Sequence, residues 1–207
     1  AWWNAKQAFE LLDTQAAIFG DEDRRRVVYL IQDFEPGFYA WSTRWVLAES
    51  TYRHPEKTIA IYNTPFLADF MSARYEFSAT EVYRPMINEG LVIPSEDQLA
   101  ADNREKIVLL YVRPHAERNC LEIIDAIVAS CFGQDPAFWS DWRFLAVGET
   151  FQPNLLNCRA IEVLGRLSLE DYRVYLGKSR LGISIMVSPH PSYPPLEMAA
   201  NGMRVLT

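Results

Sequence analysis

Residues 181–206, LGISIMVSPHPSYPPLEMAANGMRVL, decide the fold of this chain. An apolar run typical of a buried strand leads into a Pro-rich loop with Ser192 and Tyr193, and then into a short helix with Glu197 in its expected first turn. Gly202 ends this helix, and a second apolar run follows. In open α/β folds, such a loop and helix start lie at the carboxyl edge of a parallel sheet, where ligands bind. Because a carboxylate there can accept hydrogen bonds from two neighbouring sugar hydroxyls, the stretch favours a nucleotide-sugar site.

Strands and helices alternate along the rest of the chain as well. Buried strands are predicted at the apolar runs 26–32, 58–62, 106–112, 143–147, 160–164 and 182–187. Helices are predicted at 42–52, 65–75, 119–132 and 169–178. Thr64, which precedes Pro65, and Ser168, in a capping box with Asp171, mark two of the helix starts. The alternation indicates βαβ units, and therefore an α/β fold with Rossmann-like parallel sheets and helices on both faces.

The polar segment 95–104, SEDQLAADNR, is the predicted boundary between two parts of the chain, 1–94 and 105–207. Ala1 begins inside a helical pattern, and Thr207 directly follows an apolar strand. We therefore expect the chain to be part of a longer protein.

The composition of the 207 residues excludes several kinds of partner. The chain is 49% hydrophobic and can bury a core, while a formal charge of −7 argues against a nucleic-acid or anionic-membrane surface. No apolar run approaches the roughly 18 residues of a membrane-spanning helix. The start lacks the pattern of a signal peptide, so a cytoplasmic location is expected. Cys120 and Cys131 are interpreted as small core residues on one predicted helix in a reducing compartment.

Three arginines occupy equivalent places at predicted strand ends. Arg113 and Arg166 each come directly after a strand, and Arg118 lies five residues beyond Arg113, near a helix start. A single arginine there is most often an ordinary surface residue. Three of them at one sheet edge can converge on a diphosphate, which the guanidinium group binds in bidentate geometry.

Other candidate ligands have plain structural alternatives. Tyr193 can stack on a base or simply pack the Pro-rich loop, and Glu197 can be a partner of the helix dipole. His190 and Ser192 are secondary candidates for polar ligand contacts. The sequence contains no GxGxxG, GxxxxGK[ST] or HExxH motif, so NAD, ATPase and zinc-protease functions have no support.

Two carboxylates follow the first predicted strand, in QDFEPGF at 32–38. Asp33 and Glu35 are candidates to bind acceptor hydroxyls or to act as acid or base. The alternative is a solvated acidic turn.

With these residues in place, the chain resembles nucleotide-sugar glycosyltransferases of the two-lobed GT-B type. It is similar to the bacterial rhamnosyltransferases of the retaining family 4, which build surface polysaccharides. The resemblance covers most of the chain and rests on the segments 29–53, 59–71, 109–123, 163–176 and 184–202. It implies that 1–94 are the incomplete end of an acceptor-side lobe, 95–104 a linker, and 105–207 a nucleotide-sugar-binding lobe.

The resemblance also implies roles for individual residues. Arg113 matches the arginine that contacts the diphosphate, Arg118 a basic position that is usually lysine, and Arg166 a further basic position on the phosphate side. Tyr193 matches a nucleotide-contacting aromatic residue, and Glu197 matches the carboxylate that holds the ribose hydroxyls. The expected donor is dTDP-rhamnose, which supplies L-rhamnose to a growing saccharide. No metal or other cofactor is expected, because cationic side chains and a helix N-terminus would take the place of a metal.

The sequence departs from the family pattern at one position. The broader family has a second glutamate eight positions before the ribose carboxylate, and Pro189 stands there instead, with His190 beside it. Two alternatives stay open: a sugar-nucleotide epimerase of the same architecture, and a non-catalytic nucleotide-binding module. Peripheral membrane association of the full enzyme and its oligomeric state are also left open.

Overall fold

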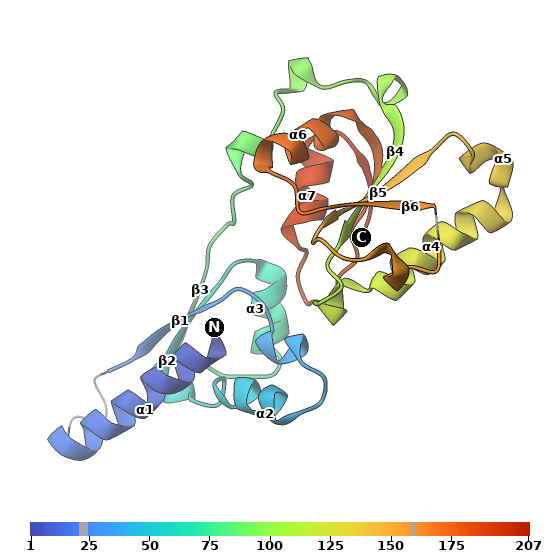
Figure 1. The fold of residues 1–207 in the computed structure, drawn as a ribbon. Helices are drawn as coiled ribbons and strands as arrows, with labels where there is room; N and C mark the ends of the chain where they lie inside the picture. Colours follow the sequence, from blue (N-terminus) through green and yellow to red (C-terminus); the bar gives the residue numbers. More distant parts are fainter. Residues whose placement is uncertain (21–24, 159) are drawn as a thin grey trace. The chain divides into compact units, whose positions relative to one another are not determined.

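A computed structural model of the chain describes residues 1–20, 25–158 and 160–207, shown as a ribbon in Figure 1. These residues form two units. The first consists of Ala1–Pro85 and Ser188–His190, and the second of Met86–Val187 and Pro191–Thr207. The chain thus leaves the second unit for three residues, which belong to the first unit, and then returns.

The first unit is built on a three-stranded parallel sheet. Its strands, in the order β1-β2-β3, are Val27–Ile31, Thr58–Tyr62 and Ala79–Val82. Its helices are α1 (Trp2–Phe19), α2 (Thr43–Ser50) and α3 (Pro65–Ser72), with 3-10 turns at Glu35–Phe38 and Pro55–Lys57. Strands and helices meet in a core rich in aromatic rings, which includes Phe9, Tyr29, Ile31, Tyr52, Tyr62, Leu67 and Met71.

Local sequence signals explain most of these elements. The Thr64 hydroxyl accepts a hydrogen bond from the Leu67 backbone N–H at 3.1 Å, and Pro65 is the first helical residue, so the predicted start of α3 is confirmed. Strand β3 was not predicted. All four of its residues, Ala79–Val82, are exposed, and they form no apolar run, so only pairing with β2 makes this segment a strand.

The second unit is built on a five-stranded parallel sheet of order β6-β5-β4-β7-β8. The strands β4 to β8 are Glu105–Val112, Arg143–Gly148, Ile161–Gly165, Ser179–Ile183 and Arg204–Leu206. The helices are α4 (Leu121–Gln134), α5 (Pro136–Trp139), α6 (Leu169–Lys178) and α7 (Tyr193–Ala200). Short 3-10 turns lie at Glu89–Leu91, Ser95–Asp97, Ala101–Asn103, Glu117–Asn119 and Pro153–Leu155.

Both faces of this sheet are covered, because alternate residues of β4 point to opposite sides. Val108 and Leu110 pack in a cluster with Ile124 of α4. Ile107 and Leu109 pack in another cluster, which contains Leu176 of α6 and Met198 of α7. The predicted α/β fold with parallel sheets is confirmed.

Three details of the second unit differ from the sequence prediction. Helix α4 runs through Gly133 to Gln134, past its predicted end at 132. Cys120 precedes that helix with a positive φ of 52°, so it does not lie on one helix with Cys131 as predicted. The strand predicted at 182–187 is shifted to Ser179–Ile183, because its residues pair with β4 and β8 in that register.

The segment 95–104 belongs to the second unit and ends in a buried arginine. The Arg104 guanidinium donates hydrogen bonds to the backbone carbonyls of Leu99 (3.1 Å), Leu176 (3.1 Å), Ser179 (3.0 Å) and Asn201. Leu176 lies in the last turn of α6, and Asn201 is the C-cap of α7. One buried cation therefore satisfies the free carbonyls at two helix ends, where the helix dipole favours positive charge.

Candidate functional site

Charged side chains gather at the carboxyl edge of the five-stranded sheet. Arg113 directly follows β4, Glu149 follows β5, and Arg166 follows β6. These three strands are neighbours and run parallel, so their carboxyl ends lie at one edge. Arg113 and Arg166 are both exposed, and two strand spacings, roughly 10 Å, separate their strands. The structure thus brings two of the predicted arginines to one sheet edge, within reach of a common anion.

A glycine turn carries Arg166. Gly165 has a φ of 74°, and a side chain there would place its Cβ 2.6 Å from the Thr150 hydroxyl oxygen. The Arg166 backbone N–H donates to the same hydroxyl at 3.3 Å. Only glycine fits this close approach, which ties the loop after β6 to the loop after β5.

A histidine–glutamate pair holds the loop after β4. His115 Nδ1 lies 2.6 Å from Glu149 Oε1, and the His115 backbone N–H contacts Glu149 Oε2 at 3.4 Å. Desolvation acts to raise the pKa of Glu149. The hydrogen bonds from His115 and the charge of Arg113 act against it, and the pKa of Glu149 lies below its ordinary value. Sequence reasoning missed this pair, although Glu149 has the same signal as the arginines: a charged residue directly after a buried strand.

A cavity of about 150 Å³ opens beside Arg166. Its walls come from the ends of β4 and β5, from the loop after β6 and from the start of α6: Tyr111, Val147, Gly148, Arg166, Leu167, Ser168, Leu169 and Tyr172. The walls are mainly apolar or aromatic, with one guanidinium group among them. Such a mixture suits a flat ring with a charged substituent.

Tyr172 connects this cavity to Glu197. The Tyr172 hydroxyl is buried, and it makes no hydrogen bond of ordinary geometry to the described residues. Burial raises the pKa of this hydroxyl, and the negative charge of Glu197 raises it further. Burial also raises the pKa of the Glu197 carboxyl, while the Tyr172 hydroxyl acts in the opposite direction. The Tyr172 hydroxyl and the Glu197 carboxyl are therefore adjacent and influence each other's protonation.

The position of Glu197 corrects one expectation. Helix α7 begins at Tyr193, so Glu197 is its fifth residue and does not lie in the first turn. The helix dipole acts mainly on groups within the first turn. The dipole role considered for Glu197 is therefore wrong.

The remaining candidates of this unit lie near the starts of α4 and α7. Arg118 is half-buried in the 3-10 turn before α4, and its carbonyl accepts a hydrogen bond from the Val187 N–H at 2.8 Å. Ser192 is the N-cap of α7, but its buried hydroxyl makes no capping bond or other hydrogen bond in the described chain. Tyr193 is the first residue of α7 and is exposed.

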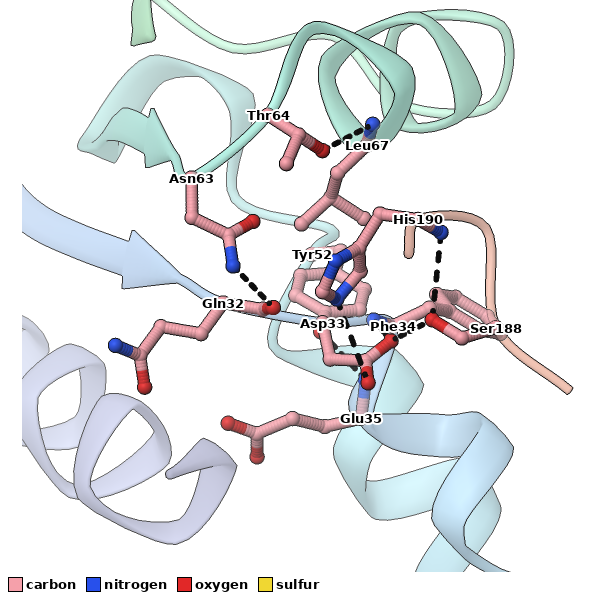
Figure 2. A network of polar contacts seen from close by, with 10 residues as sticks. All are labelled: Gln32, Asp33, Phe34, Glu35, Tyr52, Asn63, Thr64, Leu67, Ser188 and His190. Atoms are coloured by element: carbon pink, nitrogen blue, oxygen red, sulfur yellow. Dashed lines mark hydrogen bonds and ion pairs between the residues drawn. The ribbon is translucent and has the colours of Figure 1, made fainter. Parts of the chain in front are cut away.

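The candidates in the first unit form a different kind of site (Figure 2). Asp33 is buried, and its Oδ1 accepts hydrogen bonds from the Ser188 hydroxyl and the Phe34 N–H, both at 2.8 Å. Its Oδ2 lies 3.6 Å from Nε2 of the buried His190. The His190 N–H contacts the Ser188 hydroxyl at 3.4 Å. Asp33 thus binds the segment Ser188–His190, which sequence reasoning did not anticipate.

Glu35 does not join this network. Figure 2 shows its carboxylate pointing away from Asp33. It accepts a hydrogen bond from the Trp2 N–H at 2.5 Å and lies 3.6 Å from the Ala1 amino group. A carboxylate at the start of α1 is favoured by the helix dipole. The two carboxylates predicted as a functional pair therefore have separate partners.

No group of three His, Cys, Asp or Glu side chains that could hold a metal occurs within residues 1–20, 25–158 and 160–207. The Asp-x-Asp triplet at 21–23 lies outside the described residues, so metal independence stays a prediction.

No helix in the described part of the chain is long and apolar enough to cross a membrane.

Solved structures with the same fold are glycosyltransferases of the GT-B type. A sucrose-phosphate synthase from Thermosynechococcus elongatus has a TM-score of 0.61 at 15% identity, over 86% of this chain and 49% of its own. HepE of Anabaena, solved in complex with UDP and glucose, has a TM-score of 0.59 at 17% identity, over 95% of this chain and 56% of its own. These likenesses give the chain the GT-B fold.

Sequence comparison gives the family. The WsaF N-terminal domain profile matches residues 1–65, and the WsaF C-terminal domain profile matches residues 106–207. The chain therefore belongs to the WsaF family, which is of the family 4, rhamnosyltransferase-like type. The O-antigen biosynthesis protein RfbC of Myxococcus xanthus is 32% identical over 181 residues, which are 86% of this chain and 13% of that protein. The chain thus spans a small part of this relative.

Proposed function

We propose that this chain is the nucleotide-sugar-binding part of a glycosyltransferase that transfers L-rhamnose from dTDP-rhamnose to a growing bacterial polysaccharide. The observation that carries the proposal is the carboxyl edge of the five-stranded sheet. Arg113 lies at this edge, and Arg166 lines a cavity whose wall residue Tyr172 is adjacent to Glu197. The similarity to an O-antigen biosynthesis protein supports the polysaccharide product. The reaction belongs in the bacterial cytoplasm, where nucleotide sugars are made.

The diphosphate, base and ribose of the donor need different binding partners. Residues at the carboxyl edge of the five-stranded sheet suit each of these parts. The exposed guanidinium groups suit the diphosphate, and Arg118 is assigned to the same ligand by its place in the loop after β4. The aromatic and apolar walls of the cavity suit the base. Glu197 is assigned to the ribose hydroxyls. Tyr193, exposed at the start of α7, is assigned to the nucleotide, with Ser192 beside it.

Catalysis on this proposal consists of positioning and electrostatic stabilisation. As the bond between the sugar and the diphosphate breaks, negative charge grows on the leaving diphosphate. Arg113 and Arg166 offset that charge without the need for a metal. The proposed stereochemical outcome is retention.

Calorimetry with dTDP in the presence of EDTA tests the proposal. Binding without added divalent metal is expected, and thymidine should bind far more weakly because it has no phosphate for the arginines. Binding that strictly requires magnesium or manganese would refute the metal-free site. Labelled donor with and without a saccharide acceptor separates transfer from epimerisation and from binding alone.

A further inference from the structure

Two consecutive residues after β5, Glu149 and Thr150, contact the loops that follow both neighbouring strands. The Glu149 carboxylate lies 2.6 Å from the His115 ring and 3.4 Å from the His115 N–H, in the loop after β4. The Thr150 hydroxyl accepts a hydrogen bond from the Arg166 N–H at 3.3 Å, in the loop after β6. Since β5 lies between β4 and β6, the end of the central strand joins the loops that carry Arg113 and Arg166.

Two glycines bring these strand ends close together. Gly148 is paired with Val112 of β4 and has a φ of 117°, and a Cβ there would lie 2.8 Å from the Val112 carbonyl oxygen. Gly165 approaches Thr150 in the same way from the side of β6. Backbone segments this close together leave little room for the loops that follow them to shift.

The far end of the loop after β5 is held as well. Buried Asp125 of α4 accepts hydrogen bonds from the Asn157 N–H (3.0 Å), the Asn157 side-chain amide (2.9 Å) and the Cys158 N–H (2.9 Å). Burial acts to raise the pKa of Asp125. These hydrogen bonds act against it, and the pKa of Asp125 lies below its ordinary value. Phe151 and Leu156 of the same loop are buried in the core cluster beside α4, so the loop is attached to the core along its length.

We propose that Glu149 and Thr150 are positioning residues that hold Arg113 and Arg166 at the spacing at which both can bind one diphosphate. This inference rests on the proposed function, which assigns the two arginines to the donor. Loops that already have the bound geometry lose less conformational entropy when a ligand binds, and the affinity is higher for that reason. Glu149 and Thr150 therefore contribute to binding without contact with the ligand.

Thr150→Val, a change of nearly equal size, tests the contact with the loop of Arg166. Loss of the hydroxyl should weaken dTDP binding in calorimetry about fivefold, the net contribution of one ordinary hydrogen bond. Thymidine binding should not change, because thymidine has no phosphate. Thr150→Ser keeps the hydroxyl and should bind dTDP as the unmodified chain does. In an Arg166→Ala background, Thr150→Val should cause little further loss, because its effect acts through that arginine.

Glu149→Gln tests the other contact through the sign of its effect. Removal of a negative charge near Arg113 would by itself favour an anionic ligand and tighten binding. The positioning role instead predicts dTDP binding weaker by about two- to fivefold, and no weakening in an Arg113→Ala background. Glu162→Gln is the matched control, because exposed Glu162 pairs with Arg143 at 3.0 Å near the amino ends of β5 and β6. This control should leave dTDP affinity unchanged.

Unchanged dTDP affinity of Thr150→Val, or equal losses with and without Arg166, would overturn the positioning role of Thr150. Tighter or unchanged binding by Glu149→Gln would overturn that of Glu149. If denaturant unfolding shows that Thr150→Val does not fold, Thr150→Ala takes its place.

The two proposals fail in different ways. If the unmodified chain does not bind dTDP, the nucleotide site is wrong and the positioning role falls with it. If Arg113→Ala and Arg166→Ala weaken dTDP binding while the variants of Glu149 and Thr150 do not, the nucleotide site stands and only the positioning role fails.

Discussion

The carboxyl edges of the two parallel sheets carry polar side chains in two different states. In the first unit, Asp33 is buried and bonded to Ser188. In the second unit, Arg113 and Arg166 are exposed at the corresponding edge. All three residues follow the end of a strand, within two residues of it. The same sequence signal therefore leads to an internal anchor in one unit and to solvent-facing charge in the other.

The arginines of the second unit show the same contrast within one sheet. Arg104 precedes β4 at its amino end and is buried among backbone carbonyls, whereas Arg113 follows β4 at its carboxyl end and is exposed. Burial with several hydrogen bonds to backbone carbonyls marks a structural group, and exposure at a sheet edge marks a group available to a ligand. Stability and affinity measurements can separate these two roles.

The largest effect is expected from Arg104→Ala. Several buried carbonyls would lose their donor, and each unsatisfied buried group costs about 1–3 kcal/mol. The free energy of unfolding of the second unit should fall by about 3 kcal/mol or more, measured by denaturant unfolding. Arg113→Ala, at the carboxyl end of β4, should leave this free energy of unfolding nearly unchanged. Equal stability of the Arg104→Ala and Arg113→Ala variants would contradict the structural role of Arg104.

The next effect concerns binding. Arg113→Ala and Arg166→Ala should each weaken dTDP binding by about 1.5–3 kcal/mol, the range for hydrogen bonds to charged groups. Calorimetry with thymidine should show almost no change, because thymidine has no phosphate. Similar losses for dTDP and thymidine would indicate damage to the fold and not a lost diphosphate contact.

Glu197→Gln should separate affinity from stability. Burial raises the folded-state pKa of Glu197, so the folded protein holds its proton more tightly than the unfolded chain. Stability should therefore fall as the pH rises from about 4.5 through the raised folded-state pKa. Glutamine should flatten this dependence and raise stability near neutral pH by less than about 1 kcal/mol, since partial exposure screens the effect.

In contrast, dTDP affinity should fall on Glu197→Gln, because a carboxylate accepts the ribose hydroxyls more strongly than an amide does. A dTDP analogue without the 3′-hydroxyl should bind the unmodified chain less well and should lose little more in the variant. Additive losses of affinity from the analogue and from the variant would show that Glu197 does not contact the ribose.

The smallest effect is expected from Glu35→Gln, which tests the comparison within one loop. Its carboxylate caps the start of α1, so thermal or denaturant unfolding should show a loss of about 0.3–1 kcal/mol. The affinity of this variant for dTDP should not change, because Glu35 is not among the residues assigned to the donor. Weaker dTDP binding by Glu35→Gln would contradict this purely structural role of Glu35.

Local signals in the sequence predicted most of the fold. The strand Thr58–Tyr62 and the helix ending at Lys178 have their predicted bounds, because an uninterrupted apolar run and a Ser168–Asp171 capping box each act through neighbouring residues. The failures lie where distant residues decide. Strand β3 exists through its pairing with β2, and β7 takes its register from the strands on either side.

The sequence by itself determined the family, the alternation of strands and helices, and the positions of Arg113 and Arg166 at strand ends, since these depend on residue type and local order. Tertiary structure decided how the polar residues are used. It separated Asp33 from Glu35, brought Ser188 and His190 to Asp33 across 155 residues, and placed Tyr172 beside Glu197. The physical reason is that burial and hydrogen-bond partners depend on which distant segments pack together, and no local pattern records that choice.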